Sequence, residues 1–203
     1  MDILFSHVSI VTMDERMSVW VDAFLGVTDG RIAYIGKNAP EEKPERILDG
    51  AGMVLMPGLV NCHTHLPMSL LRGYGEELPL SEWLSRSIFP QEERMDARSV
   101  KAAALLSIAE CLRFGVTSVS DMYFCSDAVA EAVAESGIKA NLCHAVTTDR
   151  TDDFDPDTDP DFREAEALHD KWHGYDDGRI RVDCGIHAEY TSTYPAWEAL
   201  SKY

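Results

Sequence analysis

The hydrophobic pattern over residues 1–56 is that of short strands. Two runs rich in β-branched and aromatic residues, Ile3 to Thr12 and Val19 to Thr28, are followed by a third from Arg31 to Gly36, and such residues favour strands. The pair Asp29-Gly30 stands between the second and third runs and is typical of a two-residue hairpin turn. We therefore predict a small antiparallel β unit, too short to complete a sandwich without partner strands from elsewhere.

From Leu59 onward the pattern changes to strands that alternate with amphipathic helices. The expected strands are Val60–His65, Val116–Asp121, Ile138–Val146 and Ile180–His187. The expected helices are Leu80–Phe89, Glu92–Phe114, Ser126–Ser136, Asp161–Trp172 and Tyr194–Tyr203. Four successive strand–helix units predict a parallel sheet in an α/β fold. We place the domain boundary after residue 56, with a β domain over 1–56 and an α/β domain over 57–203.

The amino-acid composition limits the binding partners and the cellular compartment that we expect for this protein. The 203 residues carry a formal net charge of −17, which argues against nucleic acid and anionic membrane surfaces because both attract Lys and Arg. No apolar stretch approaches the ~20 residues of a membrane span, and the N-terminus lacks the pattern of a signal peptide. Five widely spaced cysteines without C-x-x-C fit a reducing cytoplasm. The acidic stretch Asp152–Asp161 is expected to be a solvated surface loop.

A His-x-His pair follows the apolar run that begins at Val54. Side chains alternate between the two faces of a strand, so His63 and His65 point to the same side. Two imidazoles can bind one Zn, Fe, Ni or Cu ion, although a catalytic zinc site normally has three protein ligands and a water. The alternative is a pair of structural histidines, but the position at the start of the strand–helix series favours the metal site.

Parallel α/β folds place their chemistry at the C-terminal ends of the strands. Asp121 ends the second expected strand, His144 lies near the end of the third, and His187 ends the fourth. We interpret His144 as either a core polar residue or part of a pocket lining. For His187 the alternatives are a loop-holding side chain and a member of the site.

The segment from Met56 to Gly73, which contains His63 and His65, resembles the amidohydrolase superfamily. The resemblance is strongest to the branch that contains 5-methylthioadenosine/S-adenosylhomocysteine deaminases and triazine chlorohydrolases. Further similar segments are Glu82-Trp83-Leu84, Phe89-Pro90-Gln91-Glu92, Gly115-Val116-Thr117-Ser118, Asp121-Met122-Tyr123 and Gly185-Ile186-His187-Ala188-Glu189-Tyr190-Thr191. The likeness therefore extends from end to end of the chain.

The resemblance implies a distorted (β/α)8 TIM-type barrel beside a β-sandwich built from both chain ends; this chain would supply the first four βα units and the N-terminal sandwich strands. It implies that His63 and His65 bind one divalent metal, most often zinc and otherwise iron. Glu92 would bind the ribose hydroxyls of a nucleoside, His187 would contact the heterocycle without binding metal, and Trp83 would line the pocket.

The activity implied is hydrolytic deamination of a 6-aminopurine nucleoside, in which metal-bound hydroxide attacks C6 and ammonia leaves. In the family a third metal-binding His and the catalytic Glu form His-x-x-Glu on strand five, and a later His and a metal-binding Asp follow on strands six and eight. None of these lies within residues 1–203. We therefore expect the activity to belong to a longer, full-length protein, which is expected to be a homo-oligomer.

Alternatives remain open at this point. The same scaffold can carry guanine deamination or triazine dechlorination, and the chain can also be an inactive fragment or one piece of a split assembly. An unrelated sheet protein with an incidental His-x-His is the third alternative. The stretch Leu142–Ala145 lacks the Arg that often lies there in deaminases of adenosylhomocysteine, so the resemblance does not extend to a preference for substrates that bear a carboxylate.

Overall fold

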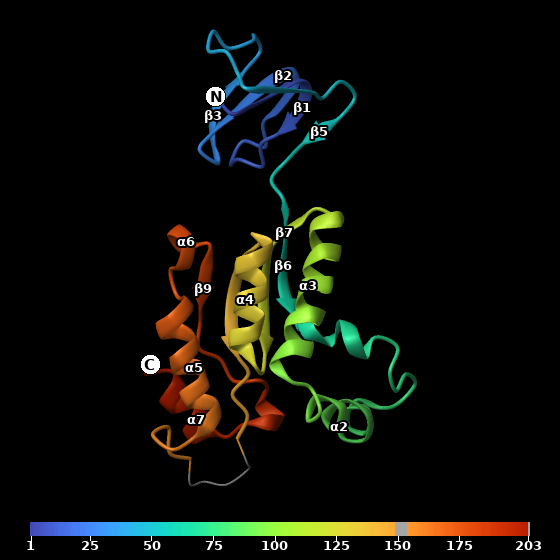
Figure 1. The fold of residues 1–203 in the computed structure, drawn as a ribbon, viewed down its shortest axis with the longest axis vertical. Helices are drawn as coiled ribbons and strands as arrows, with labels where there is room; N and C mark the ends of the chain where they lie inside the picture. Colours follow the sequence, from blue (N-terminus) through green and yellow to red (C-terminus); the bar gives the residue numbers. More distant parts are fainter. Residues whose placement is uncertain (149–153, 203) are drawn as a thin grey trace. The chain divides into compact units, whose positions relative to one another are not determined.

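The computed structural model describes residues 1–148 and 154–202 as two compact units, Met1–Gly58 and Leu59–Tyr203 (Figure 1). The first part of the expected acidic loop, residues 152 and 153, lies outside the described residues. Across the described residues, no helix combines the length and the apolar character that a membrane crossing requires.

The first unit is one sheet with strand order β3-β2-β1-β4, and β5 also pairs with β1. The strands are β1 (Ile3–Val11), β2 (Val19–Thr28), β3 (Arg31–Gly36), β4 (Arg46–Asp49) and β5 (Val54–Leu55). The expected hairpin is present, and Asp29 and Gly30 both have positive φ, 49° and 69°, as a type I′ turn requires.

The expectation of a purely antiparallel unit is wrong. β1 pairs with β2 in antiparallel fashion, but β4 and β5 both run parallel to β1. The polar connection over residues 37–45 carries the chain from one edge of the sheet to the far side of β1, so β4 enters in the same direction as β1. Strand direction across such a connection is a long-range property that residue periodicity does not contain.

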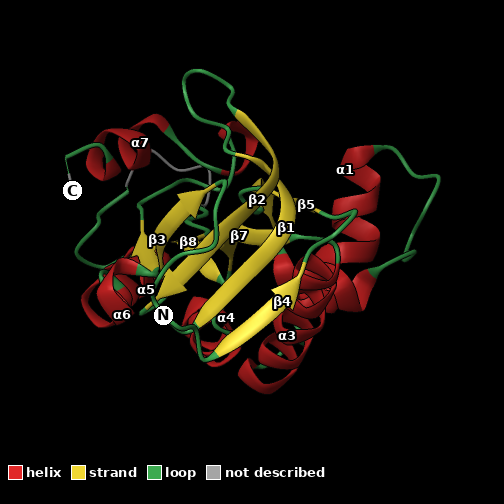
Figure 2. Ribbon diagram, turned by 90° about the horizontal axis from the view of Figure 1, so that it is seen from above, coloured by secondary structure: helices red, strands yellow, loops and turns green. Residues whose placement is uncertain are grey.

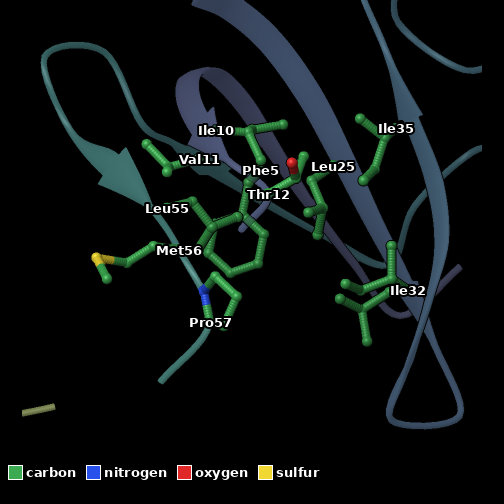
Figure 3. A pocket seen from close by; sticks show the side chains of 11 residues that line it. Phe5, Ile10, Val11, Thr12, Leu25, Ile32, Ile35, Leu55, Met56 and Pro57 are labelled. Atoms are coloured by element: carbon green, nitrogen blue, oxygen red, sulfur yellow. The ribbon is translucent and has the colours of Figure 1, made fainter. Parts of the chain in front are cut away.

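Alternate residues of β1 and β2 form the core of this unit. Val8, Ile10, Ala23 and Leu25 are buried together. Beside them lies a hollow of about 320 Å³, and Figure 3 shows Phe5, Leu25 and Leu55 among the side chains that line it. The lining contains one hydroxyl, that of Thr12, and is otherwise apolar.

The second unit is built on a parallel sheet in the order β6-β7-β8-β9. The strands are β6 (Leu59–Thr64), β7 (Val116–Tyr123), β8 (Lys139–His144) and β9 (Ile180–Val182). Three long helices pack on it, α3 (Ala97–Arg113), α4 (Ser126–Ser136) and α5 (Pro160–Trp172). Figure 2 shows β7 and β8 side by side with these helices next to them. The α/β class and the parallel sheet expected from the sequence are thus confirmed.

The core of this unit lies between the sheet and the three helices. It includes Val119, Ala140, Leu142, Ile180 and Val182 from the strands and Val100, Ile108, Val129, Val133, Leu168 and Trp172 from the helices. All of these side chains are less than a tenth exposed. A transfer free energy of roughly 25 cal/mol per Å² of apolar surface removed from water holds such layers together.

Some helix bounds match the sequence and others do not. α4 spans Ser126–Ser136 as expected, and Gly137 ends it with φ of 80°. The expected helix from Glu92 to Phe114 instead begins at Ala97, because Asp96 caps it: its carboxylate accepts from the Ser99 amide, and the Ser99 hydroxyl accepts from the Asp96 amide. Glu92 belongs to a separate short helix.

The segment before α3 is one helical stretch with a π-turn inside it. α1 (Leu80–Trp83) is followed by a π-helical turn (Leu84–Ile88) and then by α2 (Phe89–Glu92). Such π-turns are frequent at functional sites. Here the turn sits between Trp83 and Glu92, the two residues of this stretch that the resemblance assigns to the substrate.

The fourth strand is shorter than expected. β9 ends at Val182 instead of His187. Beyond it the Asp183 amide still donates to the Leu142 carbonyl at 2.9 Å, an isolated bridge pairs Ile186 with Val146, and the His187 amide donates to the Val146 carbonyl at 2.9 Å. His187 therefore lies outside the regular strand and follows an isolated bridge. Two further helices complete the unit, the unexpected short α6 (Tyr175–Gly178) and α7 (Tyr194–Leu200).

Candidate functional site

His63 and His65 lie together at the C-terminal end of β6. His63 is in the strand and exposed, while His65, half-buried, precedes a 3-10 turn over Leu66–Leu71. Their ring centroids are 4.8 Å apart, with the ring planes at 81°. The structure thus brings the two imidazoles together, as the period-two pattern predicts.

A backbone carbonyl fixes the ring of His65. Its Nδ1 lies 2.5 Å from the carbonyl oxygen of Met122 on β7. A carbonyl oxygen only accepts, so the proton is on Nδ1 and the lone pair is on Nε2. Metal-binding histidines commonly have this arrangement, in which a hydrogen bond from the second nitrogen sets the tautomer. The residues present therefore fit a metal ion. Within residues 1–148 and 154–202, no group of three or more His, Cys, Asp or Glu side chains is gathered as a metal site.

Asp121 fastens the end of β6 to β7. Its Oδ1 accepts from the Thr64 hydroxyl and from the Leu66 amide, both at 2.6 Å. The side chain is buried, and burial raises its pKa to about 6 against the opposing effect of these two hydrogen bonds. Because its partners flank His65 in the chain, Asp121 determines where His65 sits. The sequence placed Asp121 at a strand end but did not reveal this role.

Glu92 is joined to Tyr123, the last residue of β7. The tyrosine hydroxyl donates to Glu92 Oε1 at 2.7 Å. Burial raises the pKa of Glu92, and the hydrogen bond from Tyr123 works in the opposite direction. The pKa of Tyr123 is raised by its own burial and by the carboxylate. No sequence pattern marked Tyr123 as a site residue, although the Asp121-Met122-Tyr123 segment was part of the resemblance.

His187 approaches the same end of the sheet. Its ring centroid is 6.2 Å from that of His65. The Thr191 hydroxyl donates to the Ala188 carbonyl, so the contact of 2.9 Å between His187 Nδ1 and Thr191 Oγ1 is donated by the imidazole. Burial lowers the pKa of His187, assisted by the two neighbouring histidines. A neutral ring with a free Nε2 acceptor results.

Trp83 ends α1 and contacts the loop that precedes this helix. Its indole N–H donates to the carbonyl of Tyr74 at 2.9 Å, and the Gln91 amide donates to the Tyr74 hydroxyl at 3.3 Å. Trp83 and Gln91 of the helical stretch thus hold the preceding loop through two hydrogen bonds to Tyr74. Among the residues that the structure describes, no hydrogen bond or ring contact joins Trp83 to His63 or His65.

His144 lies on the other face of the sheet. It is 2 % exposed, with Nδ1 2.9 Å from the Ser126 hydroxyl of α4 and Nε2 3.6 Å from the Asp161 carboxylate of α5. These partners belong to the helix layer. Of the two interpretations from the sequence, the core polar residue is confirmed.

Comparison with known proteins places this geometry in a family. Residues 54–203 match the family model described as the Amidohydrolase family. The chain is 37% identical over 191 residues to a 5-methylthioadenosine/S-adenosylhomocysteine deaminase of Thermoanaerobacter pseudethanolicus, covering 94% of this chain and 44% of that protein. It is 36% identical over 190 residues to a 5'-deoxyadenosine deaminase of Methanosarcina acetivorans, covering 94% and 43%.

Solved structures share the fold. A Xanthomonas campestris adenosine deaminase with bound zinc superposes with a TM-score of 0.86 at 31% identity over 99% of this chain and 46% of that one. The zinc complex of the atrazine chlorohydrolase TrzN from Arthrobacter aurescens gives 0.85 at 23% identity over 98% and 50%. The chain thus spans about half the length of the relatives it matches. With the family model covering most of its residues, this chain belongs to the amidohydrolase family.

Proposed function

We propose that His63 and His65 are two ligands of one divalent metal, zinc, in a hydrolytic deaminase. The observation that carries the proposal is the 2.5 Å contact between His65 Nδ1 and the Met122 carbonyl, which leaves Nε2 free next to the ring of His63. Zinc-bound solved relatives support the choice of ion. When bound, zinc supplies Lewis-acid activation of water near neutral pH.

The substrate proposed is a 6-aminopurine nucleoside of the 5-methylthioadenosine or S-adenosylhomocysteine type. The names of the two deaminase relatives, one for 5-methylthioadenosine/S-adenosylhomocysteine and one for 5'-deoxyadenosine, support this class. Hydrolysis replaces the 6-amino group by oxygen and releases ammonia. The neutral His187 is positioned to accept a hydrogen bond from the heterocycle through Nε2, because Nδ1 is already engaged by Thr191.

Glu92 is proposed to bind the ribose hydroxyls, and Trp83 to line the pocket beside it. A carboxylate with one oxygen held by Tyr123 offers its other oxygen as an acceptor for a sugar hydroxyl. Trp83 keeps the helical stretch and the preceding loop together through Tyr74. In this arrangement the substrate's sugar faces α2 and its base faces His187.

We further propose that the four βα units are the first half of a (β/α)8 barrel in a longer protein. The remaining metal ligands and the Glu that shuttles the proton would then come from outside residues 1–203. The length of the relatives supports this, because the chain spans 44% of one deaminase and 46% of one solved adenosine deaminase. The β-strands of residues 1–56 would join others in a sandwich, and the whole protein would be a homo-oligomer.

Ammonia release by the zinc-loaded full-length protein tests the function. The panel comprises 5'-methylthioadenosine, S-adenosylhomocysteine, 5'-deoxyadenosine, adenosine, guanine and a chlorotriazine, with chloride measured for the last. We expect the adenine nucleosides to react fastest. Faster turnover of guanine, or chloride release from the triazine, would contradict the proposed substrate class. If the fully zinc-loaded protein turned over none of these compounds, the proposal of a deaminase would be rejected.

A further inference from the structure

We propose that Tyr123 is a positioning residue for sugar recognition: its hydroxyl holds Oε1 of Glu92 so that Oε2 faces the substrate. The inference rests on the proposed role of Glu92 in nucleoside binding and deepens it. Glu92 and Tyr123 belong to two elements that are distant in the chain. Glu92 ends α2, Tyr123 ends β7, and the phenolic hydroxyl reaches the carboxylate at 2.7 Å.

The two carboxylate oxygens of Glu92 are in different situations. Oε1 accepts a hydrogen bond from the Tyr123 hydroxyl. Oε2 has no hydrogen-bond partner among residues 1–148 and 154–202, and it is not one of the fully buried unpartnered atoms. Because one oxygen of this half-buried carboxylate is held by Tyr123, the other oxygen is kept in a fixed direction. Its open oxygen has two lone pairs and can accept from the two neighbouring hydroxyls of a ribose.

Tyr123 is itself held in place, as a positioning residue must be. The side chain is 4 % exposed, and its ring stacks on Phe124 with centroids 4.2 Å apart and planes at 27°. The hydroxyl also lies 3.8 Å from the sulfur of Met95, which is a weak acceptor at most. Rotating the phenol away would leave a buried hydroxyl without a hydrogen-bond partner, which is unfavourable. The ring is thus kept in the orientation that serves Glu92.

The end of β7 therefore orients both the proposed metal ligand His65 and the proposed sugar-binding residue Glu92. The carbonyl of Met122 holds His65 and the hydroxyl of the next residue, Tyr123, holds Glu92. Tyr123 is close to both residues, because its ring centroid is 6.1 Å from that of His65 and its hydroxyl contacts Glu92. A sugar bound on Glu92 and a base near the metal ligands would then keep a constant spacing, because one rigid strand end determines both positions.

The kinetic test uses Tyr123→Phe in the zinc-loaded full-length protein. We expect KM for 5'-methylthioadenosine to rise about tenfold, as the loss of a hydrogen bond to a charged group implies, with kcat little changed. For 2',3'-dideoxyadenosine, which lacks the 2'- and 3'-hydroxyls that Glu92 is proposed to bind, KM should stay the same. Tyr175→Phe, which removes an exposed hydroxyl on α6 beside Trp172, is the matched control and should change neither.

A double-variant comparison separates positioning from a structural role. In a Glu92→Ala background, Tyr123→Phe should have no further effect on KM, because the group through which it acts is gone. An equal rise in KM for both nucleosides, or a Tyr123→Phe effect that persists without Glu92, would overturn the proposal and leave Tyr123 as a core residue.

An infrared titration makes the contact testable whether or not the substrate is correct. The Glu92 carboxyl band, assigned by difference from Glu92→Gln, should titrate at higher pH in Tyr123→Phe, since the lost hydrogen bond favoured the charged form. An unmoved band overturns the positioning contact. A moved band in a protein that deaminates no nucleoside rejects the proposed function and keeps the contact.

Discussion

The Nδ1 atom of His65 lies 2.5 Å from the carbonyl oxygen of Met122, a residue 57 positions further along the chain. The contact joins β6 to β7 and sets the tautomer of His65 at the same time. A ring held in this way presents Nε2 in one direction only. Because the pair with His63 depends on that direction, the contact turns a sequence motif into a candidate metal site.

The first prediction concerns His65. In the full-length protein, His65→Ala should lose bound zinc and deaminase activity together. The variant lacks one proposed zinc ligand together with the hydrogen bond that orients it. Metal is measured by elemental analysis after dialysis, and ammonia release is followed in parallel. His169→Ala, which alters a partly exposed histidine on α5, should keep both. Zinc content equal to the parent in His65→Ala would reject the assignment of this ligand.

The second prediction separates Glu92 from the metal. Glu92→Ala should leave zinc content unchanged and raise KM for adenine ribonucleosides by about tenfold or more, because a charged hydrogen-bond acceptor for the sugar is lost. The measurement is a Michaelis–Menten series with zinc determined on the same samples. Glu93→Ala, the exposed neighbour, is the control. A loss of zinc in Glu92→Ala would instead place this carboxylate at the metal.

The third prediction is a pH dependence of stability that comes from Asp121. Burial raises the pKa of Asp121 to about 6, above the value near 3.8 from which it is shifted, so the folded state binds the proton more tightly than the unfolded state. Its contribution is therefore fully present below about pH 4 and is lost as pH rises through 6. The shift corresponds to a free energy of unfolding on the order of 3 kcal/mol.

Asp121→Asn tests that dependence. The two hydrogen bonds from Thr64 and Leu66 both end on Oδ1, and an Asn carbonyl oxygen can accept both without carrying a charge. In urea unfolding of the metal-free protein, the variant should gain stability relative to the parent between pH 4 and 7. Asp157→Asn, which alters a carboxylate that is 88% exposed, should show little change. A constant difference across the pH range would contradict the argument.

The fourth prediction concerns the start of α3. Asp96 and Ser99 form reciprocal hydrogen bonds that satisfy the first amides of this helix. Asp96→Ala should lower the free energy of unfolding by about 1 kcal/mol, as is usual for the loss of a capping residue. Chemical denaturation measures the change, with Arg98→Ala in the exposed first turn as control. A change no larger than that of the control would show that the cap contributes little.

Local patterns in the sequence determined several structural features of this protein. The alternation of a strand placed His63 and His65 on one side, and Gly137 ended α4 where expected because only a residue at ease with positive φ fits there. The Asp29-Gly30 turn likewise followed from two neighbouring residues. In each case the physical cause acts over a few positions, so the sequence alone carries it.

The tertiary structure decided what depends on residues far apart in the chain. The parallel entry of β4, the shortness of β9 and the orientation of His144 toward α4 and α5 follow from which segments pack together. Tyr123 and Glu92 are 31 positions apart, and no periodicity links them. Their hydrogen bond exists because the fold brings the end of β7 next to Glu92 of α2. The sequence by itself determined the kinds of groups at this site, and only packing determined which of them meet, since the partners are chosen by long-range burial and not by local spacing.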